Sequence, residues 1–105
     1  MSRQKVFIPR KKIADFCQRW KVVEFSLFGS ALREDFHSDS DIDVLVTFAP
    51  NTRVSLFDLV DMEDELKNVF GREVDLVEKE SILRSENYIR RKNILENTKV
   101  IYAAG

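Results

Sequence analysis

Apolar residues recur along the first part of the chain with two periods, one typical of helices and one typical of strands. A helix beginning near Pro9 is predicted by apolar positions at i, i+3, i+4 and i+7, namely Ile13, Phe16, Cys17 and Trp20. Cys17 lies within this stripe, which favours a core residue over a reactive thiol. The β-branched and aromatic run 22–28 predicts a strand with one shared apolar face, formed by Val23, Phe25 and Leu27.

The remaining pattern continues this alternation of helices and strands. A short helix is expected just after Ser30, and residues 41–48 alternate as a second strand. Residues 56–70 keep a helical period between Ser55, an N-cap with Asp58 reaching back, and Gly71. A third strand over 72–77, a helix over about 86–96 with inward Tyr88, Ile89 and Leu95, and a possible last strand at 100–102 follow. This order predicts an α/β (α+β) fold, in which a small mixed sheet is covered by helices on at least one face.

Composition narrows the class of protein. We expect residues 1–105 to form one domain, since 105 residues with 44% hydrophobic content suffice for one core. The net charge of −1 gives no overall basic field, so no direct nucleic-acid binding is expected. A single cysteine excludes an internal disulfide and a multi-cysteine zinc site. Without a signal peptide or membrane span in the pattern, a cytoplasmic protein with no membrane partner is expected.

The main candidate site combines a Gly-Ser turn with an acidic strand. Gly29 and Ser30 directly follow the first predicted strand, and ten residues later Asp41 and Asp43 alternate along the second. Residues i and i+2 of a strand point to the same face, so the two carboxylates project together and repel each other unless a cation lies between them. Asp75, on the outward face of the third strand, adds a third carboxylate if that strand lies beside the second.

Such an arrangement is suited to phosphoryl or nucleotidyl transfer. Carboxylates from two strands can hold two Mg²⁺ ions, which share their remaining ligand positions with substrate phosphates. Gly29 allows a close backbone approach, and Ser30 with nearby backbone amides can hold a triphosphate. Arg33 either contacts a phosphate or lies in a solvated loop.

Less specific interpretations stay open for several of these residues. Asp41 and Asp43 could be charges that protect an edge strand, and Asp75 could be an ordinary solvent-facing acid. Four basic residues could dock an acidic partner, bind a nucleotide or simply form a solvated face: Arg84, Arg90, Arg91 and Lys92.

The same stretches resemble a known family, the minimal nucleotidyltransferases of the DNA polymerase β-like superfamily. The matching segments are 27–33, 39–46, 55–59, 71–77 and the tail from Ile94 to Tyr102. The resemblance implies the polymerase β-like nucleotidyltransferase fold, Mg²⁺ and a nucleoside triphosphate, with ATP expected. It also implies that Asp41 and Asp43 bind both metals, that Asp75 completes the catalytic metal site, and that Ser30 binds phosphate.

The resemblance further implies a biological role. Small members of this family act as antitoxins that transfer AMP to a tyrosine of a partner HEPN ribonuclease toxin, which implies a hetero-oligomer here. One alternative is a non-catalytic antitoxin that neutralises its partner by binding alone. Another is transfer to a small molecule or an RNA end, which the absence of an acceptor domain in the predicted architecture disfavours.

Overall fold

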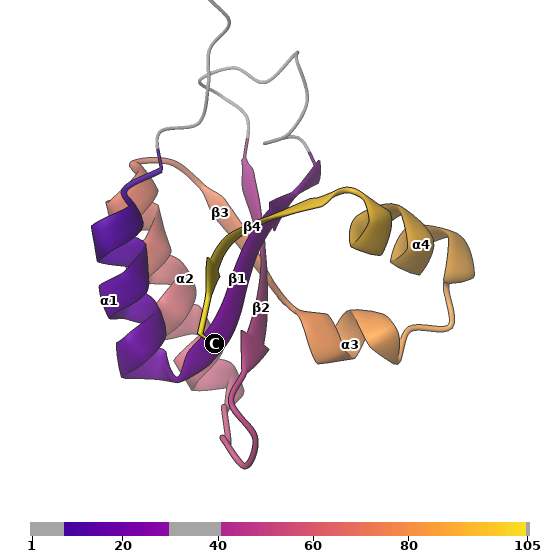
Figure 1. Ribbon diagram of the computed structural model, residues 1–105, viewed down its shortest axis with the longest axis horizontal. Coiled ribbons are helices and arrows are strands. Elements are labelled where there is room, and N and C mark those ends of the chain that lie inside the picture. The colour runs from indigo at the N-terminus through magenta and orange to yellow at the C-terminus, as the bar shows by residue number, and fades with distance from the viewer. Residues whose placement is uncertain (1–7, 30–40, 105) are drawn as a thin grey trace, which may run out of the picture.

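The protein is described by a computed structural model, which covers residues 8–29 and 41–104 and places a sheet between two pairs of helices (Figure 1). The elements in chain order are α1 (Arg10–Trp20), β1 (Val22–Phe28), β2 (Ile42–Phe48), α2 (Leu56–Phe70), β3 (Val74–Glu78), α3 (Lys79–Leu83), α4 (Tyr88–Glu96) and β4 (Thr98–Ala103). The short helix expected after Ser30 lies outside the described residues.

The four strands form one mixed sheet in the order β3-β2-β1-β4. β1 pairs antiparallel with both β2 and β4, whereas β2 and β3 are parallel and are connected through α2. The last strand, only tentative from the sequence pattern, is therefore a full member of the sheet. The predicted α/β (α+β) class with a mixed sheet is confirmed.

One face of the sheet packs against α1 and α2 and carries the larger hydrophobic core (Figure 1). Alternate residues of β2 point into this core as predicted, namely Ile42, Val44 and Val46. Phe25 in β1 meets Phe16 of α1 edge-to-face, with ring centroids 6.1 Å apart. The prediction that Val23 shares this face is wrong. The pairing of β1 with β2 is irregular between Val22 and Glu24, and this bulge turns Val22 into the core instead.

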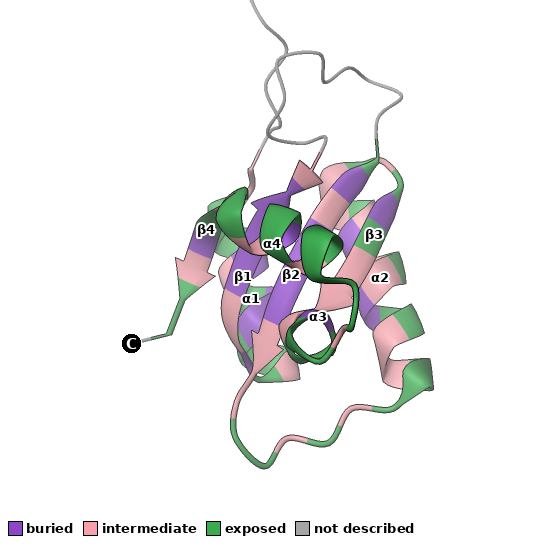
Figure 2. Cartoon of the chain, turned by 90° about the vertical axis from the view of Figure 1, so that its right-hand side faces the viewer, coloured by how far each residue is buried: buried purple, intermediate pink, exposed green. Residues whose placement is uncertain are grey.

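The opposite face is covered by α3 and α4 over a smaller core of Phe28, Leu45, Ile82 and Ile94 (Figure 2). The sequence pattern missed α3, because five residues with one buried apolar side chain are too short to show a helical period. The inward assignment of Tyr88 and Ile89 is wrong, since they are 60% and 71% exposed. Ile94 is the buried anchor of α4, and Leu95 packs beside it.

The residues predicted to begin and to end α2 do so in the structure. The Ser55 hydroxyl accepts a hydrogen bond from the Asp58 backbone N–H at 3.1 Å, and the Asp58 carboxylate accepts one from the Ser55 N–H at 3.0 Å. Gly71 ends the helix with a left-handed φ of 72°. Within the described residues, no helix is both long and apolar enough to cross a membrane.

A polar contact joins α1 to α2 above the core. Arg19 donates to both oxygens of the Glu65 carboxylate, and the Trp20 indole N–H donates to Oε1 at 3.1 Å. The bond from Arg19 is the main reason that the pKa of Glu65 lies below its ordinary value of 4.5. Beneath this contact, burial raises the pKa of the Cys17 thiol to about 12, as expected for an unreactive core residue.

We expect Glu65→Gln to lower the free energy of unfolding at pH 7 by an amount that shrinks in acid. Because folding lowers the pKa of Glu65, its contribution is fully present above pH 4.5 and is lost as the pH falls through the folded-state pKa. Urea denaturation of wild type and variant between pH 7 and pH 3 measures the difference. Asp61→Asn, an exposed acid on the same helix, serves as the control. A difference that does not change with pH would contradict this account.

Candidate active site

Two carboxylates face each other across the parallel strand pair. Asp43 in β2 and Asp75 in β3 are partners in the register, and neighbouring strands lie about 4.8 Å apart. Both alternate with residues of the larger core, Val44 and Val74, so both side chains point to the α3/α4 face. The third strand therefore lies beside the second, which the predicted cluster of carboxylates required. Like charges opposite each other in a sheet repel, so a cation between them would stabilise this arrangement.

The backbone at Gly29 lies directly against one of these carboxylates. Phe28, the last residue of β1, pairs with Asp43, and Gly29 then turns with a left-handed φ of 68°. A Cβ atom at Gly29 would overlap Oδ2 of Asp43 and lie 3.3 Å from its Cγ. Only glycine fits here without displacing the carboxylate, which is the close approach expected from the Gly-Ser motif.

These residues open into a cleft of about 890 Å³ between the sheet and α4. Phe28, Gly29, Asp43 and Asp75 form the sheet side. The other side comes from α4 and its flanking residues, which are Asn87, Ile89, Arg90, Asn93, Ile94, Asn97 and Thr98. A cleft of this volume, with carboxylates on one wall and amides and a guanidinium on the other, can accommodate a nucleotide-sized polar ligand.

The remaining predicted site residues are not all brought to this cleft. Asp41 is exposed and precedes β2, so it lacks the paired-strand geometry that holds Asp43, and it does not line the cleft. In the described ranges 8–29 and 41–104, no three His, Cys, Asp or Glu side chains lie close enough together to hold a metal ion. Ser30 and Arg33 lie outside the described residues.

The chemistry of the donors nevertheless fits a hard divalent cation. Asp43 and Asp75 supply carboxylate oxygens from adjacent strands, and the absence of a side chain at Gly29 leaves room for the Asp43 carboxylate. Mg²⁺ is usually bound by one or two carboxylates together with waters and substrate phosphates, so it does not need a complete protein cage.

From the sequence, Arg90 was one of four basic residues that could bind a nucleotide, but the other residues on the α4 side of the cleft were not identified. Asn87, Arg90, Ile94 and Asn97 recur with helical spacing, and this stripe lines the cleft. The sequence does contain a signal for these residues, because they lie at helical spacing from Ile94. Ile94 was not predicted to be the buried residue of this helix, so its neighbours on the same face were not assigned to the site.

Most of the chain matches one known protein family. The nucleotidyltransferase domain family matches residues 10–101, which include all the described strands except the last residues of β4. The chain belongs to this nucleotidyltransferase family. This match, together with solved structures that share the fold, confirms the resemblance to minimal nucleotidyltransferases and the expected polymerase β-like fold.

Relatives from two archaea are similar over most of the chain. The protein adenylyltransferase MntA of Thermococcus cleftensis is 38% identical over 65 residues, which cover 62% of this chain and 64% of MntA. MJ0435 of Methanocaldococcus jannaschii, a candidate protein adenylyltransferase, is 40% identical over 73 residues, covering 70% of this chain and 76% of MJ0435. The matched region thus spans a little under two thirds of MntA.

Solved structures share the fold. A crystal structure of a toxin–antitoxin complex with AMP-PNP contains a chain with a TM-score of 0.70 and 22% identity, covering 92% of this chain and 75% of that one. A complex of a tri-AMPylated HEPN toxin from Shewanella oneidensis with its MNT antitoxin gives a TM-score of 0.60 and 23% identity, covering 90% and 70%. At these identities the likeness establishes the fold.

Gly29→Ala tests the contact between the turn and Asp43, with Gly71→Ala as a matched control. Both glycines have a left-handed φ, so each substitution costs about 1 kcal/mol of stability from backbone conformation alone. Nothing lies within 4 Å of a Cβ at Gly71, whereas at Gly29 it overlaps Asp43. We expect Gly29→Ala to cost about 1 kcal/mol more than the control in urea denaturation, because the Asp43 side chain must leave its position.

The same pair of variants separates stability from binding. Gly71→Ala should bind ATP with Mg²⁺ as wild type does, and Gly29→Ala should bind it more weakly, as measured by calorimetric titration. Equal losses of stability and equal affinities in the two variants would show that the Gly29 contact does not matter.

Proposed function

We propose that this chain is an Mg²⁺-dependent nucleotidyltransferase that transfers AMP from ATP to a protein hydroxyl, with a tyrosine of a partner HEPN toxin as the acceptor. The single observation that carries the proposal is the pair of facing carboxylates, Asp43 and Asp75, beside the Gly29 turn. Family membership and the naming of MntA as a protein adenylyltransferase support the reaction class.

The residues of the cleft divide the work in the proposed reaction. Asp43 and Asp75 would hold Mg²⁺. Asp41, which directly precedes β2 outside the cleft lining, would add a carboxylate only once the metal and nucleotide are bound, and Gly29, Ser30 and Arg33 would bind the nucleotide. Bound Mg²⁺ would neutralise phosphate charge and lower the pKa of the attacking hydroxyl. In the transfer step the acceptor oxygen bonds to the α-phosphorus, the bond from that phosphorus to pyrophosphate breaks, and Asp75 accepts the hydroxyl proton.

The acceptor is proposed from the relatives. The AMPylated toxin in the Shewanella oneidensis complex is a HEPN protein bound to an MNT antitoxin, and one chain of that structure shares the fold of this chain. The acceptor hydroxyl of the partner would enter the cleft from solvent. The attached AMP would then inactivate the partner as a toxin. We therefore infer an antitoxin that works as a hetero-oligomer with its target.

Asp43→Asn and Asp75→Asn should each reduce AMP transfer by at least about 100-fold, because each removes a negative ligand that the charged transition state requires. Transfer is measured with α-³²P-labelled ATP and a HEPN protein, found by sequencing the genes beside the one for this chain, as the candidate acceptor. Removal of Mg²⁺ with EDTA should have the same effect as the substitutions, and replacing the modified tyrosine by phenylalanine should abolish labelling.

Asp64→Asn is the matched control, since Asp64 is an exposed acid on α2, which covers the other face of the sheet. It should leave transfer unchanged. Full transfer by both Asp43→Asn and Asp75→Asn would refute the proposed site. Toxin neutralisation by these inactive variants at the wild-type level would instead favour the alternative of an antitoxin that acts by binding alone.

A further inference from the structure

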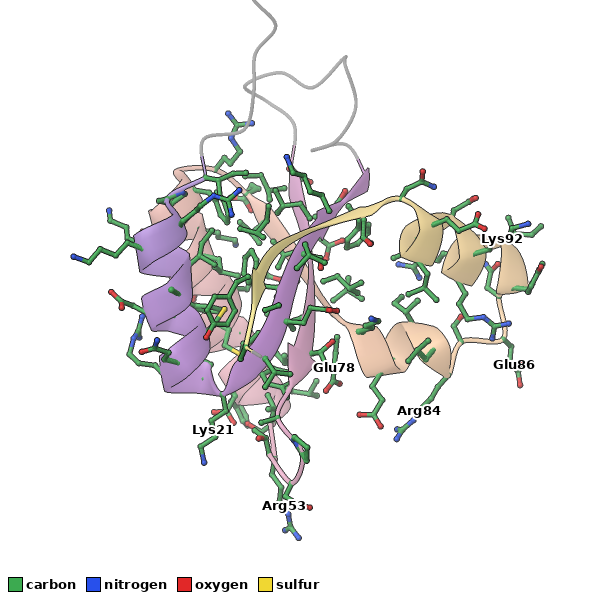
Figure 3. All side chains as sticks on the ribbon, in the orientation of Figure 1. Lys21, Arg53, Glu78, Arg84, Glu86 and Lys92 are labelled. Carbon is green, nitrogen blue, oxygen red and sulfur yellow. The ribbon has the colours of Figure 1, made fainter. Side chains whose placement is uncertain are left out.

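The four basic residues that the sequence groups near the last helix have separate surroundings in the structure. Arg84, which directly follows α3, forms an ion pair with Glu80 at 2.7 Å and projects outward (Figure 3). Arg91 donates to the Ser85 carbonyl at 3.0 Å and lies 5.6 Å from the centre of the Tyr88 ring, so it secures the connection between α3 and α4. Lys92 extends from α4 away from the sheet (Figure 3). They do not form one basic docking surface.

Arg90 differs from the other three because it faces the cleft. Arg90 and the buried anchor Ile94 are four residues apart, so they lie on the same side of α4. Ile94 packs on Phe28 and Leu45 in the smaller core, which holds this side of the helix toward the sheet. Arg90 itself is exposed, so its guanidinium is accessible to a ligand that enters the cleft.

The charges of the cleft are distributed on opposite walls. Among its described lining residues, Arg90 is the only cation, and Asp43 and Asp75 are the only anions. Within the part of the chain that the structure describes, no ion pair joins Arg90 to either carboxylate, although all three line the same cleft. The Arg90 backbone N–H donates a hydrogen bond to Oδ1 of Asn87 at 3.0 Å. Among the described residues, no hydrogen bond or ion pair engages the Arg90 guanidinium.

We propose that Arg90 binds the phosphate groups of the nucleoside triphosphate and positions it across the cleft from Asp43 and Asp75. The proposal rests on the proposed nucleotidyl transfer and adds the residue that selects a triphosphate. A triphosphate beside two carboxylates is repelled, and a planar guanidinium opposite them offsets that repulsion with paired hydrogen bonds to phosphate oxygens. When the bond between the α-phosphorus and the bridging oxygen of pyrophosphate breaks, Arg90 remains bound to the departing pyrophosphate. The guanidinium stays protonated throughout this step.

Binding rather than turnover tests this role. Calorimetric titration with ATP, AMP and adenosine, each with Mg²⁺, compares wild type with Arg90→Ala, Arg90→Lys and the control Lys92→Ala. We expect Arg90→Ala to bind ATP about tenfold or more weakly while adenosine binding is unchanged, and Arg90→Lys to recover part of the loss. Lys92 lies on the same helix but does not line the cleft, so Lys92→Ala should bind all three ligands as wild type does.

The outcomes distinguish this inference from the proposed function. ATP binding by Arg90→Ala at the wild-type level overturns the inference alone, provided that wild type binds ATP in a manner sensitive to Asp43→Asn. Equal weakening of ATP and adenosine also overturns it, since that pattern indicates a displaced helix rather than a lost phosphate contact. Loss of toxin binding without loss of ATP binding would assign Arg90 to an acidic partner surface instead. A wild-type chain that binds no ATP would overturn both proposals.

Discussion

The parallel pairing of β2 with β3 sets two negative charges opposite each other, and the core must hold them there. Asp43 and Asp75 would separate if either strand could slide, but their neighbours in sequence are buried on the other face of the sheet. A slip of one residue would expose Val44 or Val74 and bury a carboxylate, so burial determines the register. The site therefore depends on hydrophobic residues that never contact a ligand.

The two faces of the sheet serve different purposes. The face under α1 and α2 carries the larger core, with Phe16, Phe25 and Met62 fully buried. The other face is covered by two short helices over a smaller core, and the sheet beyond Phe28 and Leu45 is left open as a cleft. Incomplete coverage at this end is what makes the carboxylates accessible, because a helix packed over Asp43 would exclude any substrate.

Positive and negative groups reach this cleft from separate parts of the fold. The carboxylates come from adjacent strands, and Arg90 comes from a helix whose buried anchor is Ile94, with Leu95 packed beside it. The arrangement suits a ligand that carries both metal-binding oxygens and excess negative charge. The membership in the nucleotidyltransferase family agrees with that chemistry.

Local patterns in the sequence were sufficient for the long helices, the capping box of Ser55 and the alternating face of β2, since each depends on neighbours within a few residues. The motif of Gly29 and Asp43 was recognisable from its spacing along the chain. Only the tertiary structure decided that Asp75 pairs with Asp43, that a bulge turns Val22 inward, and that Arg90 lines the cleft while Arg91 and Lys92 do not. Strand order, register and the docking angle of a short helix depend on contacts between residues far apart in the chain. The hydrophobic periodicity of a single segment therefore does not predict strand order, register or docking angle.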